Sequence, residues 1–152
     1  MISLRAYAKI NFVLDLLGKR KDGFHELQMV MQSVSLCDVI SVKKISQSEI
    51  RIKTSRDITA QPEDNLVYRA AELFFTAAGI NDKGVEISIE KNIPIAAGLA
   101  GGSADCAGAL LAINKEFGVN YPIEKLEEIG NGLGSDIAFC LHGGTMLAEG
   151  RG

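Results

Sequence analysis

A glycine-rich stretch at residues 94–105, PIAAGLAGGSAD, has the composition of a loop that binds an anion. Small side chains let the backbone approach a ligand closely, and a helix that follows directly presents unpaired N–H groups and the positive end of its dipole. Ser103 is a natural N-cap for such a helix, which we expect to run to about Phe117 and to stop at Gly118. Phosphate is the anion that this arrangement favours. The alternative is a tight strand-to-helix turn whose glycines serve packing.

Two common nucleotide-binding motifs are absent from the sequence. It contains no GxxxxGK[ST], and the stretch GNGLGS at 130–135 lacks the GxGxxG spacing. A phosphate loop at residues 94–105 would therefore be of another type.

A second group of polar residues lies near the N-terminus. From Leu4 to Leu16 the even positions are all apolar, which predicts a strand with those residues facing the core. Tyr7, Lys9 and Asn11 then share the opposite face. If that face is covered, Lys9 needs an anionic partner, and a carboxylate or a phosphate would serve. The alternative is a lysine in contact with solvent. The imidazole of His25 follows on the next expected strand.

Asp136 follows two glycines in GSDIAF and precedes an apolar stretch. A carboxylate in a glycine-bounded loop can act as a general base or position a metal. It can also cap the helix that IAFCL would begin, and from these residues alone capping is the favoured interpretation.

The elements that position these residues follow from hydrophobic periodicity and turn signals. A basic turn, GKRKDG, separates the first strand from a second one that we expect to be antiparallel to it. Asp64 or Asn65 is the expected N-cap of the first helix and Gly79 its C′ residue. Strands are expected at 4–16, 24–34, 38–44, 49–53 and 84–90, and helices at 65–78, 103–117 and 122–130. Antiparallel strands first and helices after them indicate an α+β fold.

Composition limits the class of protein. A chain of 152 residues with 47% hydrophobic and 23% charged residues is typical of one globular domain. Its net charge of −3 disfavours nucleic acid and anionic membrane as partners, and no apolar run has the length of a membrane span. The three cysteines lack paired spacings, so we interpret them as reduced core thiols of a cytoplasmic protein. The final AEGRG stops within a strand-like pattern, which leads us to expect a fragment or the first domain of a longer protein.

These motifs resemble a known family. The stretch 94–105 resembles the Pro-x3-Gly-Leu-x-Gly-Gly-Ser phosphate loop of the GHMP kinases. The opening AYAKINFVLDLLGKRKDGFHEL is similar to the pattern AKINL…G.R.DGYHEL of the family members that phosphorylate 4-diphosphocytidyl-2-C-methyl-D-erythritol. EDNLVYRAA and GSDIAFCLHGGTMLAEGRG fit the same enzymes in order and spacing, so the resemblance covers nearly all 152 residues.

The resemblance implies a GHMP-kinase N-terminal domain over residues 1–152, related in fold to the second domain of ribosomal protein S5: a mainly antiparallel sheet packed with helices. It implies a C-terminal domain that this chain lacks. It also implies transfer of the γ-phosphoryl group of ATP, with Mg²⁺, to a hydroxyl of the cytidyl substrate in the non-mevalonate isoprenoid pathway. Because the cleft of these kinases lies between two domains, we expect this chain alone to be inactive.

The resemblance also assigns residues. By position, Asp136 matches the family's general base, and Lys9 matches the lysine beside it, which would keep that carboxylate ionised and stabilise developing charge. Asn11, Phe24 and His25 match the side that holds the cytidine substrate. The positions that match the nucleotide site are Asn65, Lys91, Pro94, Gly98, Leu99, Ala100, Gly101, Gly102 and Ser103.

Two residues depart from the family pattern. Phe24 stands where tyrosine is usual, so stacking is kept and a hydroxyl contact is lost. Ala104 stands where a second serine is usual, which puts a hydroxyl contact to phosphate or Mg²⁺ in doubt. Two rival functions remain at this point: another GHMP kinase, of the homoserine or mevalonate type, and a non-catalytic RNA-binding module like the S5 domain. The stretch DGFHEL disfavours the first, and the acidic charge balance disfavours the second.

Overall fold

A computed structural model describes residues 1–19, 23, 25–56 and 61–150. Its strands form one five-stranded sheet in the order β1-β2-β4-β3, with β5 pairing β2. The pairings are antiparallel except for β3 with β4, which is parallel. The strands are β1 (Ile2–Lys19), β2 (His25–Lys44), β3 (Ile50–Thr54), β4 (Val85–Glu90) and β5 (Thr145–Gly150). The expected α+β class with a mainly antiparallel sheet is confirmed.

The prediction of two separate strands at 24–34 and 38–44 is wrong, because β2 is continuous over 20 residues. No glycine or proline occurs between residues 24 and 44, so the chain there has no signal for a turn. β2 pairs with β1 along almost its whole length, from Ile2 opposite Val42 to Lys19 opposite His25. The result is a long hairpin.

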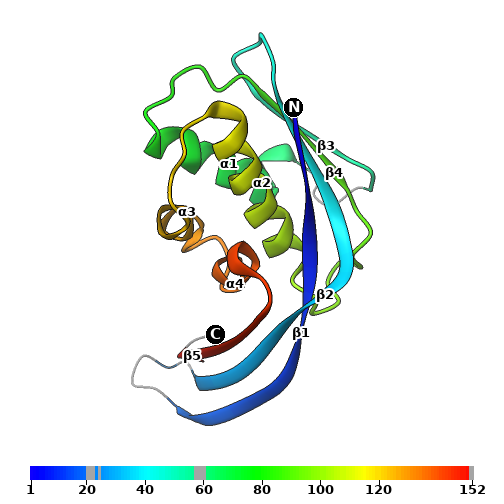
Figure 1. The fold of residues 1–152 in the computed structure, drawn as a ribbon, viewed down its shortest axis with the longest axis vertical. Coiled ribbons are helices and arrows are strands. Elements are labelled where there is room, and N and C mark those ends of the chain that lie inside the picture. The colour runs from blue at the N-terminus through cyan, green and yellow to red at the C-terminus, as the bar shows by residue number, and fades with distance from the viewer. Residues whose placement is uncertain (20–22, 24, 57–60, 151–152) are drawn as a thin grey trace.

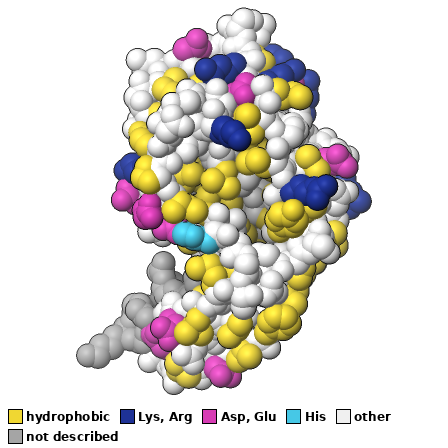
Figure 2. Space-filling model, in the orientation of Figure 1, with side chains coloured by type: hydrophobic (Ala, Val, Ile, Leu, Met, Phe, Trp, Pro, Cys, Tyr) yellow, Lys and Arg dark blue, Asp and Glu magenta, His cyan; other side chains and the backbone are white. Residues whose placement is uncertain are grey.

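The prediction that the even positions of β1 face the core holds only for the first half of the strand. Ala6 and Ala8 are buried, but Phe12, Leu14 and Leu16 are 64%, 51% and 63% exposed. The helices cover only the first half, and beyond it β1, β2 and β5 curve away as an arm (Figure 1). Figure 2, in the same orientation, shows hydrophobic side chains along this lower part of the molecule.

The helices pack together on one face of the sheet (Figure 1). They are the short 3₁₀ turn η1 (Pro62–Asp64) and the helices α1 (Leu66–Ala77), α2 (Gly101–Phe117), α3 (Ile123–Gly130) and α4 (Ile137–His142). Phe74 and Phe75 of α1 pack edge to face and are fully buried against the sheet residues Ile40 and Ile87. Burying side chains of this size contributes roughly 1.5–3 kcal/mol each. None of the helices in the described ranges is long and apolar enough to cross a membrane.

The helix boundaries confirm most of the expected capping. The Asn65 side chain accepts a hydrogen bond from the Val67 amide at 2.9 Å, and Gly79 and Gly118 take the left-handed conformation after α1 and α2. The expectation that Ser103 caps α2 is wrong, because the helix begins two residues earlier, after Ala100. Ala100 is itself left-handed, so the sharp turn into the helix occurs there.

Candidate active site

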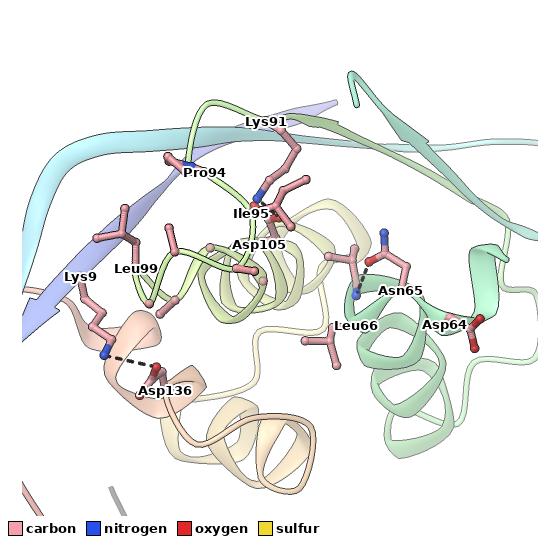
Figure 3. A pocket seen from close by; sticks show the side chains of 17 residues that line it. Lys9, Asp64, Asn65, Leu66, Lys91, Pro94, Ile95, Leu99, Asp105 and Asp136 are labelled. Atoms are coloured by element: carbon pink, nitrogen blue, oxygen red, sulfur yellow. Dashed lines mark hydrogen bonds and ion pairs between the residues drawn. The ribbon is translucent and has the colours of Figure 1, made fainter. Parts of the chain in front are cut away.

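A pocket of about 550 Å³ lies where the glycine-rich loop meets α1, α2 and the loop before α4 (Figure 3). Its volume is in the range of small-molecule sites. Most of the residues expected to bind ligand line it, although they come from distant parts of the chain. The expected residues in its wall are Lys9, Asn65, Lys91, Pro94, Gly98, Leu99, Ala100, Gly101, Gly102 and Asp136.

The loop takes a conformation that strains its backbone. Ala96 and Ala100 both have a φ of 56°, and Gly98 between them has a φ of 75°. For a residue with a Cβ, the left-handed region costs roughly 1–2 kcal/mol. Such strain persists where the surrounding structure determines the conformation, and it concentrates at functional sites.

The glycine-rich loop leads directly into α2, and the first residues of α2 line the pocket. No side chain among the described residues caps this helix end, so its first N–H groups remain available to a ligand. A Cβ on Gly101 would lie 3.0 Å from Cγ2 of Ile93 and 3.4 Å from Nζ of Lys91, so glycine is needed for this close packing. The uncapped end of a 17-residue helix behind small residues is suited to bind phosphate.

Ser103 lies in the first turn of α2 but is not part of the pocket wall. Its hydroxyl oxygen faces the segment before α4, 3.2 Å from where a Cβ on Gly134 would stand. The structure thus places Ser103 beside the pocket, where it packs against the neighbouring loop.

Lys9 and Asp136 form the most open charged pair of the site. The Lys9 Nζ lies 3.6 Å from Oδ2 of Asp136 and donates a hydrogen bond to Oδ1 of Asn11 at 3.2 Å. The Lys9 side chain is 8% exposed and that of Asp136 is 24% exposed. Both point into the pocket near Leu99 (Figure 3). The carboxylate is therefore accessible to a substrate hydroxyl and has a cation beside it.

The local backbone explains how this pair is positioned. The register of β1 with β2 shifts between Tyr7 and Lys9, and the Lys9 amide donates to the Leu99 carbonyl oxygen at 3.1 Å. This bond ties the strand to the glycine-rich loop. Asp136 stands at the N-cap position of α4, but its side chain makes no capping hydrogen bond. The interpretation of Asp136 as a capping side chain is therefore wrong.

Lys91 lies in a buried cluster that the sequence did not reveal. Its Nζ forms ion pairs with Oδ2 of Asp38 and, at 2.6 Å, with Oδ2 of Asp105. The three residues are between 0% and 5% exposed. Asp38 comes from the middle of β2 and Asp105 from the first turns of α2. The one signal in the sequence was that Asp38 and Asp105 each stand within an apolar run. A carboxylate is buried only when it is paired, so two such aspartates indicate a buried cation between them.

The two carboxylates of this cluster differ in their pKa. Burial raises the pKa of Asp38, but hydrogen bonds from Lys91 and from the amides of Ile93 and Asn92 outweigh it and leave the pKa below its ordinary value. Burial raises the pKa of Asp105 to about 7, against the effect of Lys91. Oδ1 of Asp105 has no hydrogen-bond partner among the described residues, which is consistent with the costly environment of that carboxyl group.

The residues expected on the cytidine side are less tightly grouped. Asn11 contacts Lys9 at the edge of the site. His25 is exposed and pairs with Lys19 at the far end of the hairpin, roughly 30 Å from Lys9 along the strand, so it is not part of the pocket wall. Phe24 lies outside the described residues.

The three cysteines are free thiols. Burial raises the pKa of Cys106 and of Cys140 to about 12, so both thiols are protonated near neutral pH. Neither is suited to act as a nucleophile.

Comparisons with known proteins show the family of this chain. The family model for the GHMP kinases N terminal domain matches residues 65–144. A curated relative from Clostridium beijerinckii, a 4-diphosphocytidyl-2-C-methyl-D-erythritol kinase, is 48% identical over 99% of this chain and 53% of its own length. The relative of that name from Bacillus pumilus is 47% identical over 97% of this chain and 51% of its own length.

Among solved structures, that of a 4-(cytidine 5'-diphospho)-2C-methyl-D-erythritol kinase matches with a TM-score of 0.84 at 36% identity, over 99% of this chain and 53% of the other. Homoserine kinase from Cytophaga hutchinsonii matches with a TM-score of 0.75 at 21% identity, over 96% of this chain and 47% of the other, a likeness in fold alone. The chain spans about half the length of the curated relatives it matches.

Proposed function

The chain belongs to the GHMP kinase family, and on that premise we propose that it is the nucleotide-binding half of a kinase for 4-diphosphocytidyl-2-C-methyl-D-erythritol. The reaction transfers the γ-phosphoryl group of ATP to a hydroxyl of the erythritol moiety and gives the 2-phosphate and ADP. This step belongs to the non-mevalonate isoprenoid pathway, and we expect the protein to act in the cytoplasm. The names of the relatives that cover almost the whole chain support the choice of substrate.

One observation carries the proposal: the Lys9–Asp136 pair and the uncapped start of α2 line the same pocket. Phosphoryl transfer depends mainly on positioning and on stabilising the charge of the transferred group. The loop and the N–H groups of Gly101 and Gly102 bind the phosphates of ATP. A substrate hydroxyl then lies against Asp136, on the Lys9 side of the pocket.

In this arrangement Asp136 takes the proton of the attacking hydroxyl as general base. Lys9 keeps that carboxylate ionised and stabilises negative charge as it develops on the transferred group. Asn11 holds the Lys9 ammonium in place through its side-chain oxygen. Asn65 fixes the start of α1 at the nucleotide side of the pocket.

Mg²⁺ normally accompanies ATP and neutralises its phosphates. The described residues contain no group of three or more histidine, cysteine, aspartate or glutamate side chains arranged to hold a metal ion. Because Mg²⁺ is usually held by one or two carboxylates together with substrate phosphates, we propose that it enters this site with ATP.

The test is ADP release with 4-diphosphocytidyl-2-C-methyl-D-erythritol, measured for the complete reading frame and for this 152-residue chain side by side. Homoserine and mevalonate serve as control substrates. We expect turnover of the cytidyl substrate by the long chain only. Turnover of a control substrate in its place would assign another kinase of the family. Absence of turnover with all three would contradict the proposal and direct attention first to Phe24 and Ala104.

A further inference from the structure

The phosphate loop, residues 94–103, needs support that its own sequence does not supply. Ala96 and Ala100 hold left-handed conformations that alanine disfavours, and the small side chains of the loop offer little packing. A free loop of this composition would relax to ordinary backbone conformations. Contacts at its two ends must therefore hold it in place.

Those contacts meet in the buried cluster. At the loop's entry, Oδ1 of Asp38 accepts hydrogen bonds from the backbone amides of Asn92 and, at 2.8 Å, Ile93. At its exit, Asp105 lies two residues after the loop in α2. Lys91 joins the two by ion pairs with both carboxylates and lies 3.4 Å from where a Cβ on Gly101 would stand. Figure 3 shows Lys91 reaching from the end of β4 toward Asp105, behind the loop.

We propose that Asp38, Lys91 and Asp105 form a buried brace that holds the phosphate loop in its anion-binding shape. Lys91 thus sets nucleotide affinity through the loop, as a positioning residue, because its ammonium is already engaged by two carboxylates. Asp38 is fully buried and absent from the pocket wall, so it acts only through the brace. The inference rests on the proposed function in taking ATP as the ligand of the loop.

The test substitutes Asp38→Asn in the full-length enzyme. The amide keeps the shape of the side chain and one oxygen for the Ile93 amide, but it removes the charge that Lys91 binds. We expect the KM for ATP to rise at least tenfold while the KM for the acceptor stays within twofold. We also expect amide hydrogen exchange in residues 94–103 of the ligand-free enzyme to accelerate at least tenfold. A residue that only supported the overall fold would not separate the two KM values.

Glu86→Gln is the matched control. Glu86 is 5% exposed, lies on the same sheet and forms ion pairs with Lys43 and Lys53, both at 2.9 Å, yet it is not part of the pocket. We expect its loop exchange and its KM for ATP to match the wild type within twofold. If Asp38→Asn does not fold, Asp105→Asn at the other end of the brace decides by loop exchange alone, because Asp105 itself lines the pocket.

The outcomes separate this inference from the proposed function. Faster exchange confined to residues 94–103, with weaker ATP binding, supports the brace. Exchange and ATP binding equal to those of Glu86→Gln overturn it. Hydrogen exchange needs no substrate, so it decides the brace even if the wild-type enzyme fails to phosphorylate the cytidyl substrate, a result that would overturn only the proposed reaction.

Discussion

Two lysines line the same pocket and have opposite surroundings. Counted over the whole residue, Lys9 is 7% exposed and Lys91 is 5% exposed. Lys9 has one carboxylate at 3.6 Å and the oxygen of an amide, whereas Lys91 is in direct contact with two carboxylates. The pair with Asp136 is loose and open to a substrate; the cluster around Lys91 is closed. Residue type and burial alone thus do not distinguish a lysine that is open to a ligand from one that is enclosed by carboxylates, whereas the partners do.

The largest expected effect is on the open pair. We predict that Asp136→Asn in the complete enzyme lowers kcat at least about 10³-fold, because the amide cannot accept the hydroxyl proton. The affinity for ATP should stay within a few-fold, since Asp136 is not part of the phosphate loop. Steady-state kinetics and ATP binding by calorimetry check both halves. Retained turnover would remove Asp136 as the base.

The next prediction compares the replacement of each lysine by methionine. Lys91→Met leaves two buried carboxylates without a cation and should lower the free energy of unfolding by about 3–5 kcal/mol. Lys9→Met should cost about 1 kcal/mol or less, because Asp136 is partly exposed, while kcat falls sharply. Urea denaturation and kinetics of both variants provide the comparison. Equal losses of stability would show that the two clusters do not differ in the way described.

A smaller effect is expected at the far end of the hairpin. His25 lies along the strand roughly 30 Å from Lys9, so the resemblance alone assigns it to the cytidine side. On that assignment we predict that His25→Ala weakens binding of the cytidyl substrate by about tenfold, the value of one hydrogen bond, and leaves ATP binding almost unchanged. The two KM values measure this difference. Equal losses for the two ligands would mean that His25 is structural.

The smallest expected effect is a pH dependence. Burial raises the pKa of Asp105 to about 7, so the folded state holds a proton that the unfolded chain releases near pH 4. Stability due to this group is greatest at low pH and is lost as pH rises to about 7. The pKa of Asp38 is lowered, so this carboxylate is ionised at both pH 5 and pH 7. Its contribution to stability is the same at the two pH values and does not affect the comparison.

The asparagine side chain of the variant Asp105→Asn does not titrate, so this variant lacks the pH dependence that Asp105 gives the wild type. We therefore predict that the free energy of unfolding of the wild type falls by about 1 kcal/mol or more, relative to that of Asp105→Asn, as the pH rises from 5 to 7. Denaturation at several pH values measures this difference. Parallel pH profiles of the two proteins would contradict the raised pKa.

Much of this protein follows from local sequence. Period-two alternation predicts β1, and capping residues such as Asn65, Gly79 and Gly118 predict the ends of helices, since these signals act between near neighbours. The motifs that resemble the GHMP kinases predict the family. The small residues of 94–103 predict the phosphate loop.

The tertiary structure decided what depends on distant partners. The exposure of Phe12 to Leu16 and the failure of the Asp136 side chain to cap α4 depend on which elements cover each strand and each loop. The Asp38–Lys91–Asp105 cluster joins residues that are 53 and 14 positions apart. The sequence by itself determined the elements and the kinase motifs, because these signals are local. Folding alone decided which charges meet, because the energy of a buried ion depends on the atoms around it.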